Sequence, residues 1–278
     1  MLDRTGGRDI NWAIASPRTA VRWHISFLLF CIVALTFLDR MNMSVAARNI
    51  QLEFGLNNSQ IGFILSAYVV GYALFQIPSG LLGDRFGPRK LLAFAMAWWS
   101  VFTGLTAVVP GLAHLSGLGL VGAFFAMRFL VGVGEAAAMP NCNKTVAQWM
   151  APSERGIGNS LFLTGIGFGG AISQPLIAVL ISHLGWRWSF VICGLLGVPA
   201  VLVWWWHGRD RPEDHPRVSP AELAYIRLQA GTAKGTEKSR GSFKLRPFLR
   251  ERTLWALLAS YFLQGYSFTF SILGSICT

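Results

Sequence analysis

The stretch GLLGDRFGPRK, residues 80–90, decides the fold of this chain. It joins two apolar runs, residues 59–82 and 91–110, and each run is close to the roughly 20 residues that a membrane-spanning helix needs. The glycines of the stretch permit a tight turn, and its arginines and lysine favour the cytoplasmic side of a membrane. The sequence therefore predicts two spanning helices joined by a short, charged cytoplasmic turn.

Apolar runs of similar length recur along the chain. They cover residues 23–47, 59–82, 91–110, 118–141, 158–183, 189–206 and 253–276. Hydrophobic residues make up 53% of the 278 residues and charged residues 13%, against about 25% charged residues in a typical soluble domain. We therefore expect an all-α integral membrane protein.

The long polar segment after the sixth run predicts the domain organisation. A cytoplasmic tail at residues 1–22 precedes a six-helix transporter half at 23–207, and a cytoplasmic interdomain loop at 208–252 leads to one further helix at 253–278. Six spans, a long loop and a seventh span are typical of carriers built from two six-helix halves. We expect the N-terminal half of such a carrier, followed by the first helix of a truncated C-terminal half.

The interdomain loop contains two local patterns. Ser219, Pro220 and Glu222 have the residue types of an N-cap, a first helical position and a third helical position, which predicts a short surface helix at 220–230. Residues 231–241 are rich in Gly, Thr, Lys and Ser and predict a flexible linker.

The basic residues fix the expected orientation. With the N-terminus in the cytoplasm, only Arg48 and Arg187 fall outside. The cytoplasmic set comprises Arg4, Arg8, Arg18, Arg22, Arg85, Arg89, Lys90, Lys144, Arg155 and every basic residue of the loop. The basic residues behind the net charge of +11 are thus distributed according to the side of the membrane, and they do not form one nucleic-acid-binding patch. The sequence predicts a multi-pass protein of the inner, cytoplasmic membrane, in contact with the lipid bilayer and not with nucleic acid.

Four ionisable residues interrupt the apolar runs: Asp39 and Arg40 in the first, and Arg128 and Glu135 in the fourth. A charge at the centre of a bilayer costs roughly 2.5–3.5 kcal/mol even on the mildest scale, so such residues face one another or a water-filled path. Arg128 and Glu135 lie seven positions apart, which places them on one helix face about 10 Å apart in depth. Two carboxylates and two guanidiniums suit a carrier of an anion and a cation; fixed structural ion pairs are the alternative.

One face of the second run offers hydrogen-bonding groups. The residues that share this face are Tyr68, Tyr72, Phe75, Gln76 and Ser79. Their hydroxyl and amide groups can orient a hydroxylated anion, but an aromatic stripe is equally typical of helix packing. Asn141 and Asn143, which follow Pro140, are weaker candidates for the same task.

Metal, cofactor and enzyme chemistry are not indicated. The four cysteines have no CxxC spacing, the five histidines are scattered, and no loop contains a nucleophile with a base. Gly165 and Gly169 form a GxxxG pair, which predicts close helix packing and not a phosphate-binding loop. We therefore expect no cofactor, no metal site and no enzymatic activity.

Several stretches together indicate a family. The 80–90 stretch resembles the signature cytoplasmic loop of the major facilitator superfamily, and FLDRMNMS at 37–44 resembles the first-helix motif of its anion:cation symporter branch. Further matching stretches are SAY at 66–68, QIPSG at 76–80, RFLVGVGEA at 128–136, ERG at 154–156 and GWR at 185–187. The branch often has a tyrosine where this chain has Phe37.

The resemblance also implies roles for residues. Asp39 and Glu135 couple transport to protons, Arg40 binds the anion, and Arg128 is the partner of Glu135 or a second substrate contact. The candidate substrate-binding residues are Arg40, Tyr72, Gln76, Arg128 and Asn141. The candidate gating loop comprises Gly80, Asp84, Arg85, Gly87 and Arg89.

The expected function is proton-coupled symport of small organic anions, such as sugar acids or other carboxylates. The resemblance favours protons over sodium, and the fifth run lacks the Gly-Pro pairing of antiporters in this superfamily, which favours symport. Two alternatives stay open. One is a membrane sensor that binds an anion without transporting it, and the other is a truncated chain that cannot transport because its second half is absent.

Overall fold

The computed structural model of the protein describes residues 19–117 and 119–233 and isolated residues between 251 and 263. The chain divides into two units, Met1–Lys234 and Gly235–Thr278. The predicted helix at 253–276, most of the linker predicted at 231–241 and most of the tail at 1–22 lie outside the described residues.

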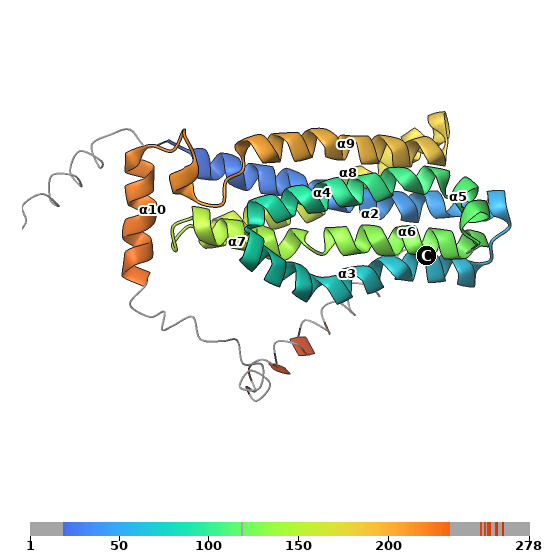
Figure 1. Ribbon diagram of the computed structural model, residues 1–278, viewed down its shortest axis with the longest axis horizontal. Helices are drawn as coiled ribbons and strands as arrows, with labels where there is room; N and C mark the ends of the chain where they lie inside the picture. The colour runs from blue at the N-terminus through green and yellow to red at the C-terminus, as the bar shows by residue number, and fades with distance from the viewer. Residues whose placement is uncertain are drawn as a thin grey trace, which may run out of the picture. The chain divides into compact units, whose positions relative to one another are not determined.

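Among the described residues of the first unit, six helical segments are long and apolar enough to cross a membrane (Figure 1). They are α2 (Val21–Phe54), α3 (Asn58–Phe86), the segment Pro88–Ala113, the segment Gly119–Trp149, α8 (Arg155–Leu184) and α9 (Trp186–His207). The third contains α4 (Pro88–Leu105), the 3-10 turn η1 (Thr106–Val108) and the start of α5 (Val109–Ser116), and the fourth contains α6 (Gly119–Glu135) and α7 (Ala138–Trp149). The predicted all-α membrane fold with six spans is thereby confirmed.

The fourth span is broken, which the sequence reading did not predict. Pro140 lacks a backbone N–H, and a proline ring inside a helix clashes with the carbonyl four residues earlier, here that of Ala136. The helix accordingly breaks between Glu135 and Ala138. The released Ala136 carbonyl accepts a hydrogen bond from Ser79 Oγ at 3.0 Å, so α3 stabilises the break.

Glycines let the helices approach each other closely. A Cβ atom on Gly165 or Gly169 of α8 would lie 2.6 Å from a backbone carbonyl oxygen of α2, which confirms close packing at the GxxxG pair. On the other side of the bundle, a Cβ on Gly71 of α3 would lie 2.4 Å from Phe129 O, and one on Gly132 of α6 would lie 2.3 Å from Tyr68 O. The backbones of α3 and α6 are therefore in direct contact.

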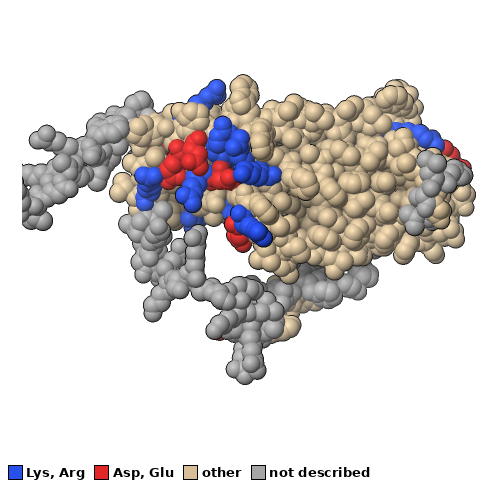
Figure 2. All heavy atoms as spheres, viewed as in Figure 1, with Lys and Arg blue, Asp and Glu red and all other residues tan. Residues whose placement is uncertain are grey.

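Charged side chains gather at the two ends of the bundle in the view of Figure 2, and a zone without charged side chains lies between them. After α9 the chain forms the short turn η2 (Pro212–Asp214) and then α10 (Pro220–Ala233). Ser219 Oγ accepts a hydrogen bond from the backbone N–H of Glu222, as the predicted N-cap requires. Glu222 itself is fully buried and accepts hydrogen bonds from Thr19 and Arg22, which attaches α10 to the start of α2.

Candidate functional site

The four ionisable residues of the spans lie inside the bundle. Asp39, Arg128 and Glu135 are 3%, 2% and 1% exposed. The side chain of Arg40 retains 29% exposure and is therefore only partly buried. Asp39 and Arg40 come from α2, and Arg128 and Glu135 come from α6. Two helices far apart in sequence thus bring their charges into one region.

A single tyrosine hydroxyl connects the two helices. Arg40 Nε donates a hydrogen bond to Tyr68 Oη at 2.9 Å, and Tyr68 Oη donates one to Glu135 Oε2 at 2.6 Å. Arg40 Nη2 also lies 4.0 Å from the same Glu135 oxygen. Tyr68 is on α3, and the glycine contacts between α3 and α6 bring it to Glu135. The close backbone packing therefore builds the site.

Aromatic rings hold the Arg40 guanidinium in place. Its Cζ atom lies 4.5 Å from the ring centre of Phe37, 4.9 Å from that of Tyr68 and 5.3 Å from that of Tyr72. Arg128 Cζ lies 5.2 Å from the same Tyr68 ring. Such cation–π contacts stabilise a guanidinium without neutralising its charge. The Phe37 ring thus supports Arg40 even though it lacks the hydroxyl that the branch often has there.

Several buried polar atoms of the cluster have no hydrogen-bond partner among the residues that the structure describes. They are Asp39 Oδ1, Glu135 Oε1, and Nε and Nη1 of Arg128. Buried polar atoms are normally hydrogen-bonded, so a set of orphaned acceptors and donors in one region indicates a place for water, a proton or a ligand. Asp39 and Arg40 do not satisfy each other, because Arg40 bonds to Tyr68 instead. The alternative of a self-contained ion pair at these neighbours therefore loses its support.

Two other predicted substrate residues lie apart from this cluster. Gln76 is exposed on α3, two turns beyond Tyr68. Asn141 is fully buried on α7, where its Nδ2 donates to Ala137 O at 2.8 Å and its Oδ1 occupies the space beside Gly83. The structure thus brings Arg40, Tyr72 and Arg128 around Tyr68, but it does not bring Gln76 or Asn141 into contact with them.

The predicted gating loop is tied to two other segments. Asp84 forms an ion pair with Lys144 of α7, and Lys144 Nζ donates to Gly80 O at 3.3 Å. On its other side, the backbone N–H of Arg89 donates to Asp210 Oδ1 at 2.9 Å.

Gly87 sits at the turn with φ +87°, where a Cβ would lie 2.7 Å from the Asp210 carboxylate. Only glycine fits this conformation and this approach. Arg85 Cζ lies over the Phe86 ring at 5.4 Å. The loop therefore joins the ends of α3, α4, α7 and α9.

The central role of Tyr68 in the site was not predicted from the sequence. Tyr68 appears in the polar face of the second run, yet the candidate substrate residues chosen there are Tyr72 and Gln76. Only the rotation of α3 against α6 decides which tyrosine reaches Glu135, and periodicity alone does not give that rotation. One feature of the sequence could have indicated Tyr68: it lies three residues before Gly71, on the same helix face, and that face contacts Gly132 of α6.

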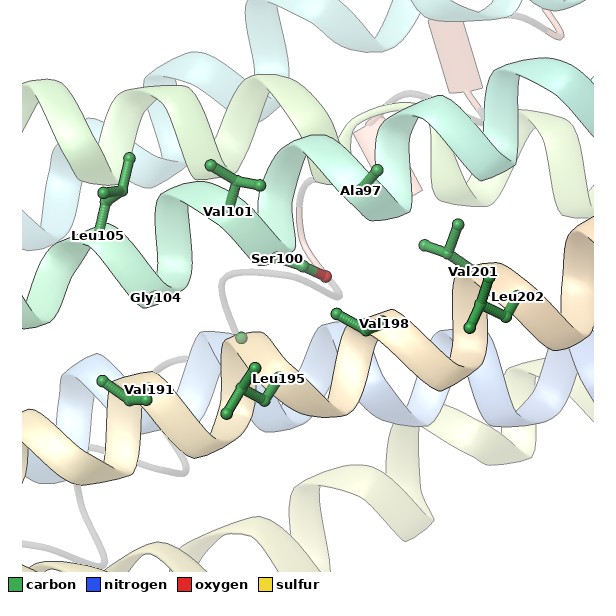
Figure 3. Close-up of a pocket in the computed structure, with 11 residues that line it drawn as sticks. Ala97, Ser100, Val101, Gly104, Leu105, Val191, Leu195, Val198, Val201 and Leu202 are labelled. Atoms are coloured by element: carbon green, nitrogen blue, oxygen red, sulfur yellow. The ribbon is translucent and has the colours of Figure 1, made fainter.

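An apolar groove of about 450 Å³ lies elsewhere, between α4 and α9 (Figure 3). Ser100 supplies its one polar side chain, and the other lining residues are aliphatic or glycine. None of the charged residues of the cluster lines it. The groove offers nothing that would bind an anion, so the charged cluster remains the candidate site.

The fold is a helical membrane bundle that encloses buried, partly unpaired charges, and the comparisons with known proteins identify its family. The sequence matches the Major Facilitator Superfamily over residues 29–276, and the chain belongs to this family. It is therefore a multi-pass membrane protein of a transporter family and not an enzyme.

Similar proteins include two from Bacillus subtilis (strain 168). The uncharacterized transporter YybO is 37% identical over 91% of this chain and 55% of its own length. A "Probable galactarate/D-glucarate transporter", GudP, is 32% identical over 92% of this chain and 56% of its own length. The chain thus spans about half the length of the curated relatives it matches.

Solved structures show the same fold. The proton:xylose symporter XylE from E. coli aligns with a TM-score of 0.63 at 18% identity, over 78% of this chain and 53% of the other. At this identity the similarity establishes the arrangement of the helices alone.

Proposed function

We propose that this chain forms the N-terminal half of a proton-coupled symporter for small organic anions, such as sugar acids or other carboxylates. The relative named for galactarate and D-glucarate supports the substrate class. The observation that carries the proposal is the Tyr68 hydroxyl, which links the partly accessible Arg40 to the buried Glu135. One residue that attracts anions and one that can hold a proton thereby share a hydrogen-bonded path.

Arg40 is the proposed anion-binding residue. Its guanidinium can form two parallel hydrogen bonds with a substrate carboxylate, the geometry in which arginine binds carboxylates best. Tyr72 lies beside it, 5.3 Å from the guanidinium carbon to the ring centre, and orients hydroxyl groups of the substrate. Gln76 and Asn141 lie apart from Arg40 in this structure and remain proposed substrate contacts only for another conformation, and Arg128 provides a second positive charge beside Tyr68.

The coupling follows from competition for Arg40. Unprotonated Glu135 attracts Arg40 across 4.0 Å, an interaction of about 4 kcal/mol at an effective dielectric constant of 20. A proton on Glu135 removes this attraction and frees the guanidinium for the substrate carboxylate. The charges of Asp39, Arg40, Arg128 and Glu135 cancel, so one anion and one proton enter together without leaving a net charge in the bundle. Asp39 is the second proposed proton site.

The loop at 80–90 is the proposed gate. Its bonds to Lys144 and Asp210 hold the ends of four helices together, and these bonds must break when that end of the bundle opens. The proposed orientation places this end and the N-terminus in the cytoplasm, with the protein in the inner membrane. The surplus of arginine and lysine at this end supports that orientation.

The test of anion binding uses the chain in lipid nanodiscs and isothermal titration calorimetry with D-glucarate. Arg40→Gln removes two charge-assisted hydrogen bonds of about 1.5 kcal/mol each, which weakens binding roughly 100-fold. Arg48→Gln is the matched control, because Arg48 is an exposed arginine on the same helix. Equal affinity of the Arg40→Gln chain and the unchanged chain would overturn the proposed role of Arg40.

The test of symport uses proteoliposomes and labelled D-glucarate. Accumulation that follows an inward proton gradient and stops on addition of a protonophore supports symport. Binding without any accumulation supports the sensor or the truncated chain that cannot transport.

A further inference from the structure

A second pocket lies far from the proposed transport site along the helices, where α2 begins and α9 ends. It has a volume of about 260 Å³ and is lined by His24, His207, His215 and Arg217, together with Thr19, Ala20 and Val21 at the start of α2. A smaller pocket of about 100 Å³ adjoins it through three shared residues and adds Arg209. None of the residues that line either pocket is acidic.

Among the described residues, no acidic side chain forms an ion pair with the arginines that line these two pockets. Within residues 19–117 and 119–233, the guanidinium of Arg217 forms no ion pair. Burial, together with the charges of Arg209, His207 and Arg217, holds the pKa of His215 below its ordinary value. The acidic group that acts on His215 in the opposite direction is Glu222, and its carboxylate is engaged by Thr19 and Arg22.

Two contacts hold the imidazole of His215 in its orientation. Its Nδ1 accepts a hydrogen bond from the backbone N–H of Arg217 at 3.2 Å, and its ring packs edge-on against Trp149 at 5.7 Å. Because Nδ1 is the acceptor, the neutral ring carries its proton on Nε2 and has a donor to offer. The pocket thus presents imidazole and guanidinium donors from the end of α9 and from the segment before α10.

The surroundings of the pocket match the surface of a membrane. Trp205 and Trp206 are exposed at the end of α9, as in the aromatic belts that lie at headgroup depth. One turn further into the span, Phe27 on α2 and Val203 on α9 are exposed as well. Basic donors at the surface followed by apolar side chains toward the middle fit an amphiphile better than a free ion.

We propose that this pocket binds the phosphate group of an anionic phospholipid. The phosphate oxygens accept hydrogen bonds from Arg217, Arg209 and the histidines, and the acyl chains lie along the exposed apolar faces of α2 and α9. The bound lipid connects the start of α2 to the end of α9. The inference does not depend on the proposed transport function, because it involves none of the residues around Tyr68.

Native mass spectrometry of the delipidated chain tests the proposal. Phosphatidylglycerol and phosphatidylcholine with the same acyl chains are compared, and phosphatidylglycerol binds roughly tenfold more tightly. The double variant His207→Gln/Arg217→Gln loses this preference. Arg227→Gln keeps it, because Arg227 is an exposed arginine that lines neither pocket. Equal binding of the two lipids, or equal loss in both variants, overturns the proposal.

Two further measurements distinguish a lipid site from a site for free phosphate, and lipid binding from an effect of misfolded variants. Inorganic phosphate at millimolar concentration leaves phosphatidylglycerol bound; its displacement by phosphate would overturn the assignment to a lipid. In nuclear magnetic resonance titrations of the unchanged chain, the pKa of His215 is higher in phosphatidylglycerol nanodiscs than in phosphatidylcholine nanodiscs. The same pKa in both would show that no anion enters the pocket.

Discussion

Replacement of Gly132 by alanine tests how helix packing positions the site. The added Cβ would lie 2.3 Å from Tyr68 O and 3.0 Å from Tyr72 N, whereas ordinary contacts begin at 3.4 Å. Relieving the closer contact requires α3 and α6 to separate locally by about 1.1 Å, from 2.3 to 3.4 Å. Overpacking of this kind costs about 1–3 kcal/mol of stability.

The same separation of α3 and α6 would disturb the charged cluster around Tyr68. The hydrogen bond from Tyr68 to Glu135 measures 2.6 Å, and a shift of about 1.1 Å along it gives a distance at which no hydrogen bond remains. The loss of a hydrogen bond to a charged group costs about 1.5 kcal/mol, which corresponds to roughly tenfold weaker binding of D-glucarate. Gly132→Ala should therefore lower the unfolding temperature and the affinity together.

The assay measures thermal unfolding in detergent and D-glucarate affinity in nanodiscs on the same preparations. Gly167→Ala is the matched control, because a Cβ at this exposed helix position would meet nothing within 4 Å. Its effect should be neutral, or stabilising by up to about 1 kcal/mol from helix propensity. If Gly132→Ala unfolds and binds like the unchanged chain, the close contact of α3 and α6 does not position Tyr68.

The end of the bundle that contains α10 yields three more predictions. Glu222→Ala removes one of the two carboxylates that pair with Arg22, leaves Glu154 as the other, and costs about 1–3 kcal/mol, so amide hydrogen exchange in α10 should accelerate; unchanged protection would refute the attachment. The pKa of His215 is lowered in the folded chain, so unfolding takes up a proton and the stability present above pH 6.5 is lost as the pH falls through the folded pKa. Thermal unfolding between pH 8 and 5 should show this loss, and His215→Phe should reduce it; an identical pH profile in the variant would count against it. Asp84→Asn removes an exposed ion pair and should change stability by less than about 1 kcal/mol in chemical unfolding, and a larger loss would mean that the pair is more than a surface contact.

The six spans could be predicted from sequence because each needs a long apolar run, and hydropathy alone reveals such runs. Their ends could not, since helices continue past the hydrocarbon zone until a capping residue stops them. The first span was predicted at 23–47, but α2 extends to Phe54, where Gly55 takes φ +63° and Asn57 caps the next helix. The break after Glu135 was not predicted either. Predicting it would have required the inference that the ring of Pro140 clashes with the carbonyl four residues earlier.

The same distinction applies to the candidate site: its charged residues could be predicted from the sequence, and its contacts between helices could not. The sequence identified Asp39, Arg40, Arg128 and Glu135, because charges are rare and costly in apolar spans. It could not assign the central contact to Tyr68, because that contact depends on how far α3 and α6 approach each other. The orphaned polar atoms of Arg128 also became visible only in three dimensions.

The central claim is that a proton on Glu135 and an anion on Arg40 bind together. Its most direct measurement counts protons taken up from a weakly buffered solution, by a pH-sensitive dye, as D-glucarate is added to the chain in nanodiscs. The account predicts about one proton per bound anion near neutral pH, and binding without proton uptake in Glu135→Gln. Proton uptake that is absent from the unchanged chain, or undiminished in Glu135→Gln, would contradict it.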